Sequence, residues 1–302
     1  MLGALACSCV KTREDRMAIS FAPVSSKPTK AIISGAIYPH DVPFVVNAYY
    51  GGTTQYFAED RQATYNSTQN LFETTTPEYW PLSGSLTFQA YSPASAGLTI
   101  ASAGVSIEDY TVQTAGQMTT DLLYATATVA DCTVHDPVQL VFDHALAQVV
   151  FQVKPADYYP SNSLSLDSLS LGGICSVGDF SSADLWDNLG SEYTYVIRNS
   201  SLALTCNEDD EPVTATLGSY LLIPQELGSA AALNVAYTIS QTVGGTTYTL
   251  ENPPVSIPLG GTVTEWEAGK KYIYTLNIGL NLINFTASYA PWDSIDGGFV
   301  VE

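Results

Sequence analysis

Charged residues, and basic ones above all, are scarce in this chain of 302 residues. Only 13% of the residues are charged while 46% are hydrophobic, and ten Lys and Arg face thirty Asp and Glu, for a net charge of −20. A chain this hydrophobic and this poor in charge is not intrinsically disordered. Nucleic acid is excluded as a partner, because binding it depends on Lys and Arg that neutralise phosphates. An anionic membrane surface is disfavoured for the same electrostatic reason.

Cysteine and histidine are too few and too scattered to suggest a metal centre. Cys132, Cys175 and Cys206 have separations that match no metal-site spacing, and the three histidines do not cluster. The three cysteines are expected as small buried side chains, with one disulfide among them as the alternative. His144 lies in a strand-like run and is expected to pack there.

Catalytic and phosphate-binding motifs are lacking as well. The sequence has no Gly-x-Ser-x-Gly, no Walker loop and no His-Glu-x-x-His. The acidic run Asn207–Glu211 lacks the alternation and the glycine of an EF-hand loop, so it is expected to be a solvated loop. The expectation is a protein that is not an enzyme and holds no cofactor. A glycan-active enzyme with two carboxylates ranks below the other hypotheses.

No part of the sequence approaches the ~18 consecutive apolar residues of a membrane-spanning helix. The first residues, Met1–Cys9, nevertheless read like the end of a signal peptide that runs into small residues and cysteine. This pattern resembles a bacterial lipobox with Cys7 as the lipidated residue, or Cys9 as the second choice, although Ala4 stands where leucine is usual. The true start is then expected upstream of Met1, and membrane contact is expected through a lipid anchor only.

Residues that suit strands and turns are abundant. The chain has 31 Thr, 29 Ser and 19 Tyr, together with 22 Gly and 16 Pro, a composition typical of pleated strands joined by turns. Many short strands without βαβ alternation argue against a parallel sheet. The expected fold is all-β, with two tandem β-sandwich domains at residues 31–136 and 137–302 behind an N-terminal segment at residues 1–30.

Alternation of apolar residues locates individual strands. Residues 42–50 read as a strand followed by a turn. In Tyr272–Ile278 the residues at even positions are expected to face a core. In Leu140–Val153 the apolar set moves from even to odd positions. Because successive strand residues point to opposite faces, this change predicts a bulge or bend near Ala145–Gln148. Ser182–Leu189 is expected to form one or two short helical turns.

A set of short motifs resembles, in order and spacing, the fimbrillin (Mfa-like) family from about Ala31 to Glu302. These motifs are Tyr79-Trp80-Pro81, Phe88-Gln89-Ala90-Tyr91-Ser92-Pro93, Thr120-Asp121-Leu122-Leu123-Tyr124-Ala125, Val141-Phe142-Asp143-His144-Ala145-Leu146, Leu221-Leu222-Ile223-Pro224-Gln225, Trp266-Glu267-Ala268-Gly269-Lys270-Lys271-Tyr272-Ile273-Tyr274 and Ala290-Pro291-Trp292-Asp293. The family comprises the type V pilus subunits and accessory lipoproteins of anaerobic gut and oral bacteria.

The resemblance implies a fold, a location and a mode of assembly. It implies two transthyretin-like (Greek-key) β-sandwich domains, export as a lipoprotein, and a place at the outer membrane surface or in the fimbrium. It also implies that a trypsin-like surface protease cuts after a basic residue in the N-terminal segment and removes the first strand. Other fimbrial subunits then join when an extended strand of one fills the groove of the next, which is β-augmentation in physical terms.

The resemblance also points to the processing site. Residues 17–24 alternate and are expected to be the removable strand. Thr29-Lys30-Ala31 resembles the Thr-Arg-Ala site of the family, so cleavage is expected after Lys30. Lys27 is a poor alternative because Pro28 follows it. Asp-Ser-aliphatic triplets, similar to the O-glycosylation pattern of exported proteins of these bacteria, mark Ser168 and Ser294.

Three hypotheses about function follow. The first is a structural or accessory fimbrial subunit that functions in adhesion, and the second is a non-polymerising surface lipoprotein that binds a glycan or a host protein. Tyr49-Tyr50 and Tyr158-Tyr159 are the loops expected to bind in the second case. The third is the enzyme. Whether Gly297–Glu302 pairs within its own domain would separate a stalk from a tip or anchor role.

The distribution of basic residues fits such processing. Five of the ten lie among the first thirty residues, beside two acids, Glu14 and Asp15. Removal of that segment would leave a body with 28 acids and five bases, a net charge of −23. Those five are Arg61, Lys154, Arg198, Lys270 and Lys271, so the body offers few sites to a trypsin-like protease.

Overall fold

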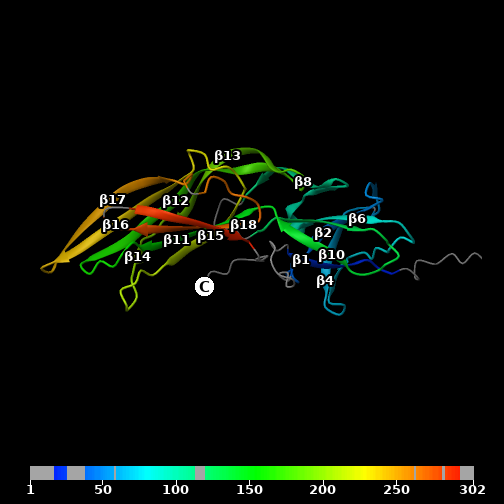
Figure 1. Cartoon of the computed structure of the whole chain (residues 1–302), viewed down its shortest axis with the longest axis horizontal. Helices are drawn as coiled ribbons and strands as arrows, with labels where there is room; N and C mark the ends of the chain where they lie inside the picture. The colour runs from blue at the N-terminus through cyan, green and yellow to red at the C-terminus, as the bar shows by residue number, and fades with distance from the viewer. Residues whose placement is uncertain are drawn as a thin grey trace, which may run out of the picture.

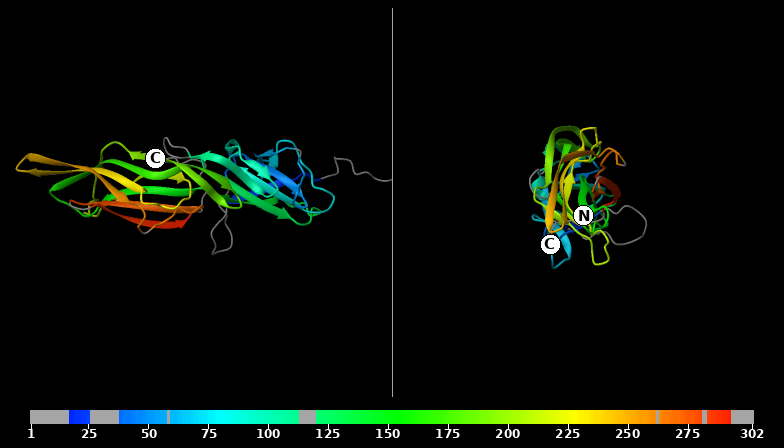
Figure 2. Two further views of the ribbon diagram at one scale, coloured as in Figure 1. Left: turned by 90° about the horizontal axis from the view of Figure 1, so that it is seen from above. Right: turned by 90° about the vertical axis from the view of Figure 1, so that its left-hand side faces the viewer.

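The computed structural model describes residues 17–25, 38–57, 59–112, 120–261, 263–280 and 283–292. The molecule is elongated, with an N-terminal half and a C-terminal half arranged end to end (Figure 1). Seen from above, a two-stranded hairpin extends beyond the C-terminal half along the long axis (Figure 2). Apart from one short 3-10 helix, η2 (Ala94–Ala96), the regular elements among these residues are strands. The expected all-β fold is confirmed.

Eight strands form one sheet in the N-terminal half, called here the N-terminal sheet. Their order is β3 (Thr54–Gln55), β2 (Phe44–Tyr50), β4 (Arg61–Asn66), β5 (Leu71–Thr74), β1 (Ser20–Ser25), β10 (Val138–His144), β9 (Leu123–Val129) and β6 (Leu86–Ser92). Because β2 also pairs with β6, the sheet closes on itself. Closure leaves few backbone groups unpaired at open edges.

Two sheets build the C-terminal half, called here the C-terminal sandwich. One has the order β15 (Ala215–Leu222), β11 (Ala147–Pro155), β18 (Lys270–Ile278) and β19 (Ile283–Pro291). The other has the order β17 (Thr246–Pro258), β16 (Ala232–Val243), β12 (Asn162–Ser181), β8 (Gly104–Thr111) and β7 (Thr99–Ala101), while β13 (Leu185–Arg198) and β14 (Leu202–Leu204) also pair with β12. Buried side chains from both sheets share one core, as the predicted sandwich requires.

Strand β18 shows how the sequence pattern produces this packing. Tyr272, Tyr274, Leu276 and Ile278 are buried, and the residues between them are half-buried. The predicted inward face is therefore confirmed. Alternation places every second side chain in the core because successive strand residues point to opposite faces.

The chain passes from one half to the other at a bend after β10. Ala145 and Leu146 form this bend, and β11 then continues in the four-stranded sheet. The predicted change of face near Ala145–Gln148 is confirmed, and it is made by a bend that separates two strands. The domain boundary expected at residue 136 stays a prediction, and the change of sheet itself falls later, at this bend.

A hairpin joins the two halves at a second place. Strands β7 and β8 lie in the sequence between β6 and β9, which are neighbours in the N-terminal sheet. Yet β8 pairs with the C-terminal end of β12, where Val177 lies opposite Thr111 and Ser181 lies opposite Ser106. In Figure 1, β8 lies where the two halves meet. The halves are thus joined by backbone hydrogen bonds as well as by the chain.

One local expectation was met only in part. Ser182–Leu189, expected to form helical turns, contains a turn at residues 182–184 followed by the start of β13. Leu185 and Asn188 have positive φ values of 65° and 48°, and the register between β12 and β13 shifts in several places. Irregular backbone of this kind belongs to a bulged, twisted strand pair, which obscures the strand pattern in the sequence.

The structure also bears on the cysteines and on membrane contact. Cys132, Cys175 and Cys206 are free thiols, with Cys132 buried and the other two half-buried. Within the described ranges, the chain has no helix with the length and apolar character needed to cross a bilayer. Those same ranges hold no group of three or more His, Cys, Asp or Glu placed to bind a metal ion.

Candidate functional site: strand β1 and its slot

Strand β1 lies in the segment that the family resemblance indicates as removable. Ile19, Phe21 and Pro23 are buried, whereas Ser20 and Ala22 between them are half-buried. This alternation allows the segment to extend across a core as a strand. The prediction of a strand within residues 17–24 is confirmed by β1, with Ala18 bridging to Tyr79 just before it.

Both edges of β1 are hydrogen-bonded. Phe21–Ser25 run parallel to Val138–Phe142 of β10, and Ser20 and Phe21 lie antiparallel to Glu73 and Phe72 of β5. The pairing with β5 ends before Pro23, whose nitrogen has no hydrogen to donate. The pairing with β10 is the one parallel ladder among the described strands of this sheet.

Backbone hydrogen bonds also hold residues 17–19, which lead into β1. The Ile19 amide donates to the Glu78 carbonyl at 2.7 Å, and the Trp80 amide donates to the Met17 carbonyl at 3.1 Å. These bonds place residues 17–19 beside the segment before β6. Residues 17–19 are therefore held against the N-terminal sheet, together with β1. The next described segment begins at Tyr38.

Phe21 anchors β1 in the aromatic core of the N-terminal sheet. Its side chain is completely buried and makes edge-to-face contacts with Phe44 and Phe88, with ring centroids 5.8 Å and 5.7 Å apart. Truncation of a buried Phe to Ala costs about 3–5 kcal/mol. Most of the affinity of this segment for the sheet is therefore expected to come from Phe21 and Ile19.

Removal of β1 would create a defined binding site for another strand. We call the space between β5 and β10 the β1 slot. With β1 absent, Phe44 and Phe88 would lose their contacts with the Phe21 ring, and the facing backbone groups of β5 and β10 would lose their partners. Unpaired strand edges and an uncovered apolar floor are the features that an extended peptide recognises by β-augmentation.

The structure locates only some of the site residues predicted from the sequence. Cys7, Cys9, Lys30 and Ser294 lie outside the described residues, so lipidation, cleavage and one glycosylation site remain predictions. Ser168 lies half-buried in β12, opposite Ala236 of β16. The neighbouring carboxylate of Asp167 accepts hydrogen bonds from hydroxyls of Ser165, Ser201 and Thr238.

The two tyrosine pairs expected to bind a ligand differ in exposure. Tyr49 is buried, and its hydroxyl donates to the Ile100 carbonyl at 3.2 Å. Tyr50 is 39% exposed and Tyr158 is 43% exposed. The side chain of Tyr49 therefore packs inside the protein, and Tyr158 presents the more accessible ring.

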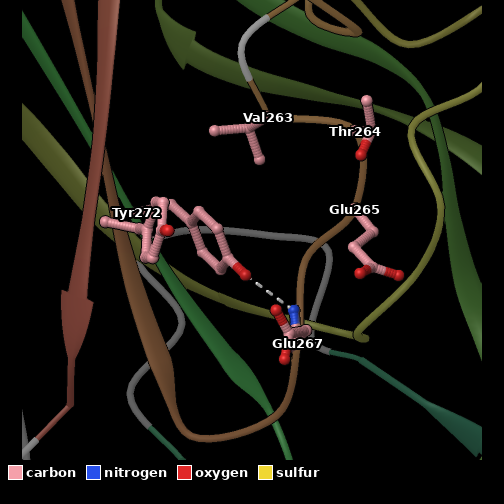
Figure 3. A pocket seen from close by; sticks show the side chains of 6 residues that line it. Val263, Thr264, Glu265, Glu267 and Tyr272 are labelled. Carbon is pink, nitrogen blue, oxygen red and sulfur yellow. Dashed lines mark hydrogen bonds between the residues drawn. The ribbon is translucent and has the colours of Figure 1, made fainter.

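A recess on the C-terminal sandwich brings two carboxylates together with two aromatic rings. Its lining residues are Val263, Thr264, Glu265, Glu267, Tyr272 and Tyr289. Figure 3 shows the Tyr272 hydroxyl directed at the backbone amide of Glu267, which donates to it at 2.9 Å. The Glu267 carboxylate is paired with the Lys270 ammonium, which also lies 5.5 Å from the centre of the Tyr289 ring. One carboxylate and one ring of the recess are therefore already engaged by a cation of the protein itself.

His144 makes a contact that sequence reasoning missed. The prediction that it packs in a strand is confirmed, since only 3% of it is exposed. Its Nδ1 lies 2.7 Å from Oδ2 of Asp121, and its ring stacks on Trp292 at 3.9 Å. These residues come from three separate segments that meet between the two halves, so no local sequence pattern could reveal them.

The acidic run at residues 207–211 forms the solvated loop that was expected. Its residues are exposed, and the Asn207 side chain accepts hydrogen bonds from the amides of Asp209 and Glu211 at 3.0 Å and 2.9 Å. An asparagine oxygen that receives nearby backbone amides is a common way to close a turn. This run is therefore held by the chain's own hydrogen bonds.

The chain is similar to fimbrial and cell adhesion proteins. A family model described as Fimbrillin-like matches residues 43–292. A fimbrial protein from Bacteroides vulgatus has 19% identity and a TM-score of 0.57, over 82% of this chain and 92% of that chain. A candidate cell adhesion protein from Bacteroides ovatus has 18% identity and a TM-score of 0.55, over 95% of this chain and 99% of that chain.

A candidate cell adhesion protein from Bacteroides uniformis is similar to the same extent, with 17% identity and a TM-score of 0.53, over 93% of this chain and 99% of that chain. At such identities the likeness shows the fold. No curated protein matches the chain.

Proposed function

The chain belongs to the fimbrillin-like family, and from that premise we propose that it is a fimbrial subunit that assembles at the cell surface by donor-strand exchange. In this proposal a trypsin-like protease cuts after Lys30 and releases β1. An extended strand of a neighbouring subunit then fills the β1 slot. The protein functions in adhesion as part of the resulting fimbria, and a lipid on Cys7, or on Cys9, attaches it to the outer membrane before assembly.

The position of β1 carries the proposal. It lies inside the sheet, paired on both edges, yet it belongs to the first described segment of the chain. A cut after Lys30 would leave β1 attached by hydrogen bonds and by side chains such as Phe21 alone. A second strand with apolar residues at alternate positions can replace those same interactions.

The parallel pairing with β10 supports exchange as well. Parallel ladders are slightly less stable per residue than antiparallel ones, and β1 is parallel to β10 over five residue pairs. An incoming strand in the opposite direction would be antiparallel to β10, where β1 has five residue pairs, and parallel to β5, where β1 has two. Exchange would then improve the backbone pairing on the longer of the two ladders.

Limited proteolysis tests the proposal. We expect low-dose trypsin to produce one early product that begins at Ala31, followed by a ladder of oligomers that resist SDS. Lys30→Gln should abolish both the product and the ladder. Lys27→Gln is the matched control and should behave like the wild type, because Pro28 already blocks cleavage after Lys27. Cleavage without a ladder would contradict strand exchange, and an uncut monomer would contradict processing at Lys30.

A second candidate function is a non-polymerising surface lipoprotein that binds a glycan or a host protein. The observation that favours it is an exposed tyrosine, Tyr158, beside a recess at the end of the C-terminal sandwich. The same trypsin experiment separates the two candidates, because a non-polymerising protein forms no ladder after cleavage.

A further inference from the structure

A recess lies between two loops of the C-terminal sandwich, and we call it the Tyr158 recess. One loop joins β11 to β12, and the other joins β14 to β15. Strand β11 begins at the bend between the two halves and ends at Pro155. Its C-terminal end therefore lies away from the N-terminal sheet, and so does the recess. In Figure 1 these loops lie at the lower left of the molecule. The lining residues are Pro155, Asp157, Tyr158, Tyr159, Asn162, Leu164, Leu204, Thr205, Cys206 and Asn207.

The recess has an apolar floor and aromatic walls. Pro155 and Leu164 are buried and Leu204 is half-buried, so the floor is continuous with packed side chains. Tyr159 is half-buried, and Tyr158 is 43% exposed. Tyrosine combines an apolar ring with a hydroxyl, which makes it suited to ligands that are themselves partly apolar and partly polar.

Polar groups surround this floor, and two of them are held in place. Asp157 accepts a hydrogen bond from the Tyr158 amide at 2.8 Å, and the Asn207 side-chain oxygen accepts two from its own loop. The carboxylate of Asp157 and the amides of Asn162 and Asn207 can together accept and donate hydrogen bonds. Groups that are already oriented lose less entropy when a ligand binds.

The electrostatic field of the recess excludes anionic ligands. None of its lining residues is Lys, Arg or His. Burial raises the pKa of the Cys206 thiol, and the nearby carboxylates of Asp210, Asp157 and Glu211 raise it further. Asp210, Asp157 and Glu211 therefore place negative charge near the thiol. Phosphate, sulfate and carboxylate ligands would be repelled by the same charges.

The size of the recess limits the ligand further. Its volume is about 280 Å³, close to the lower end of the roughly 300–1,000 Å³ typical of small-molecule sites. A nucleotide or a long peptide would extend far outside it. One or two sugar rings, with an apolar face and hydroxyls at the rim, match its size, its tyrosine walls and its neutral and acidic hydrogen-bonding groups.

We propose that the Tyr158 recess binds a neutral saccharide. A pyranose ring lies with its C–H face against Tyr158, and its hydroxyls bond to Asp157, Asn162 and Asn207. A neutral saccharide would then be the ligand for the adhesive role in the proposed function, and the assignment of this ligand rests on that role. Its place far from the N-terminal sheet leaves it separate from the β1 slot.

Binding of simple methyl glycosides to the full chain tests the proposal. The probes are the methyl glycosides of glucose, galactose, mannose, fucose and N-acetylglucosamine, measured by saturation-transfer NMR and calorimetric titration. We expect at least one to bind, and we expect Tyr158→Ala and Asn162→Ala each to weaken it by tenfold or more. Tyr248→Ala is the matched control, because Tyr248 is an exposed tyrosine on the β16–β17 hairpin, and it should leave binding unchanged.

Two results would overturn the proposal. One is the failure of every glycoside to bind at about 20 mM, a concentration at which a ligand with a dissociation constant in the low millimolar range would be mostly bound. The other is binding that Tyr158→Ala leaves unaltered. Circular dichroism of each variant shows whether the fold is retained, and Asn162→Ala provides a second variant should Tyr158→Ala be unstable.

Cys206 offers a second measurement at the site itself. Its half-buried thiol lines the recess, so a bound glycoside should slow its modification by N-ethylmaleimide. Cys175, also half-buried but in β12, is the internal reference and should react at an unchanged rate. Peptide mapping by mass spectrometry distinguishes the two thiols. Equal rates at Cys206 with and without glycoside would contradict binding there, whatever the result of the trypsin experiment on assembly.

Discussion

Strands β1 and β12 both lie inside a sheet, yet they are attached to the molecule in opposite ways. Strand β1 has six residues and pairs with two neighbours. Strand β12 has twenty residues and pairs with β13, β14, β16 and β8. Loss of β1 opens one slot in one sheet, whereas loss of β12 would take apart the C-terminal sandwich and its link to the N-terminal half. The difference suits a molecule in which one half exchanges a strand and the other stays intact.

The largest expected effect comes from truncating one anchor residue in each half. Phe21→Ala should lower the free energy of unfolding of the N-terminal half by about 3–5 kcal/mol, because Phe21 is completely buried. Phe151→Ala should destabilise the C-terminal half by a similar amount, since Phe151 is equally buried between Tyr220 and Tyr274. Urea unfolding, followed by circular dichroism, measures both.

The effects of Phe21→Ala and Phe151→Ala should differ most in the assembled form. After residues 1–30 are removed and the slot is refilled, position 21 is absent, so Phe21→Ala should have no effect on the assembled form. Phe151→Ala should cost as much as before. Val24→Ala is the matched control in β1, because Val24 is only half-buried. A persistent effect of Phe21→Ala in assembled protein would mean that β1 is retained.

Alkaline pH should weaken both halves through buried tyrosines. Burial raises the pKa of Tyr274 in the C-terminal core to about 12, and the hydrogen bond from Trp266 opposes part of this rise. Burial likewise raises the pKa of Tyr38 in the N-terminal core. Between pH 10 and pH 12 the unfolded chain loses the Tyr274 proton while the folded chain keeps it, so stability falls as pH rises, by roughly 2–3 kcal/mol.

Replacing each of the two tyrosines by phenylalanine shows which half loses stability at alkaline pH. Tyr274→Phe should flatten the alkaline decline of the C-terminal transition, and Tyr38→Phe should flatten that of the N-terminal transition. Urea midpoints measured from pH 8 to pH 12 provide the test. A decline that is the same in wild type and in both variants would show that these two tyrosines are not its cause.

A smaller effect is expected where the halves meet. The Trp186 indole nitrogen donates to the Ala145 carbonyl at 2.5 Å, which links β13 to the bend between β10 and β11. Trp186→Phe keeps a ring against Phe180 and Tyr110 but removes the donor, at a cost of about 1–2 kcal/mol. The two urea transitions should also move further apart. Unchanged midpoints would mean that the halves are coupled elsewhere, through β8.

Local patterns in the sequence predicted the features that depend on one strand at a time. The inward face of Tyr272–Ile278 and the bend near Ala145 both follow from which positions are apolar. The strand character of β1 follows from alternation in the same way. The proposal that β1 can be exchanged came from the family resemblance, because alternation does not say whether a strand is replaceable.

Features that depend on distant partners were not predictable in this way. Strand β8 pairs with β12 although the β7–β8 hairpin lies in the sequence between β6 and β9, which both belong to the N-terminal sheet. The contact between Asp121 and His144 joins residues that are 23 positions apart. The Tyr158 recess combines two loops, and its tyrosines were visible in the sequence while Asn207 and Cys206 were not associated with them. Pairing across sheets is set by the whole fold, so single-strand patterns carry no signal for it.

The smallest effect is expected on the β16–β17 hairpin. Tyr248 is 63% exposed and Leu250 is 58% exposed, and the hairpin extends beyond the body of the molecule (Figure 2). Tyr248→Ser should therefore change the free energy of unfolding by no more than about 0.5 kcal/mol in the monomer, as measured in urea. The same substitution in the assembled form separates two cases. A loss of more than about 1 kcal/mol there would mean that assembly buries the hairpin, which would extend the contact between subunits beyond the β1 slot and make the C-terminal half a participant in it.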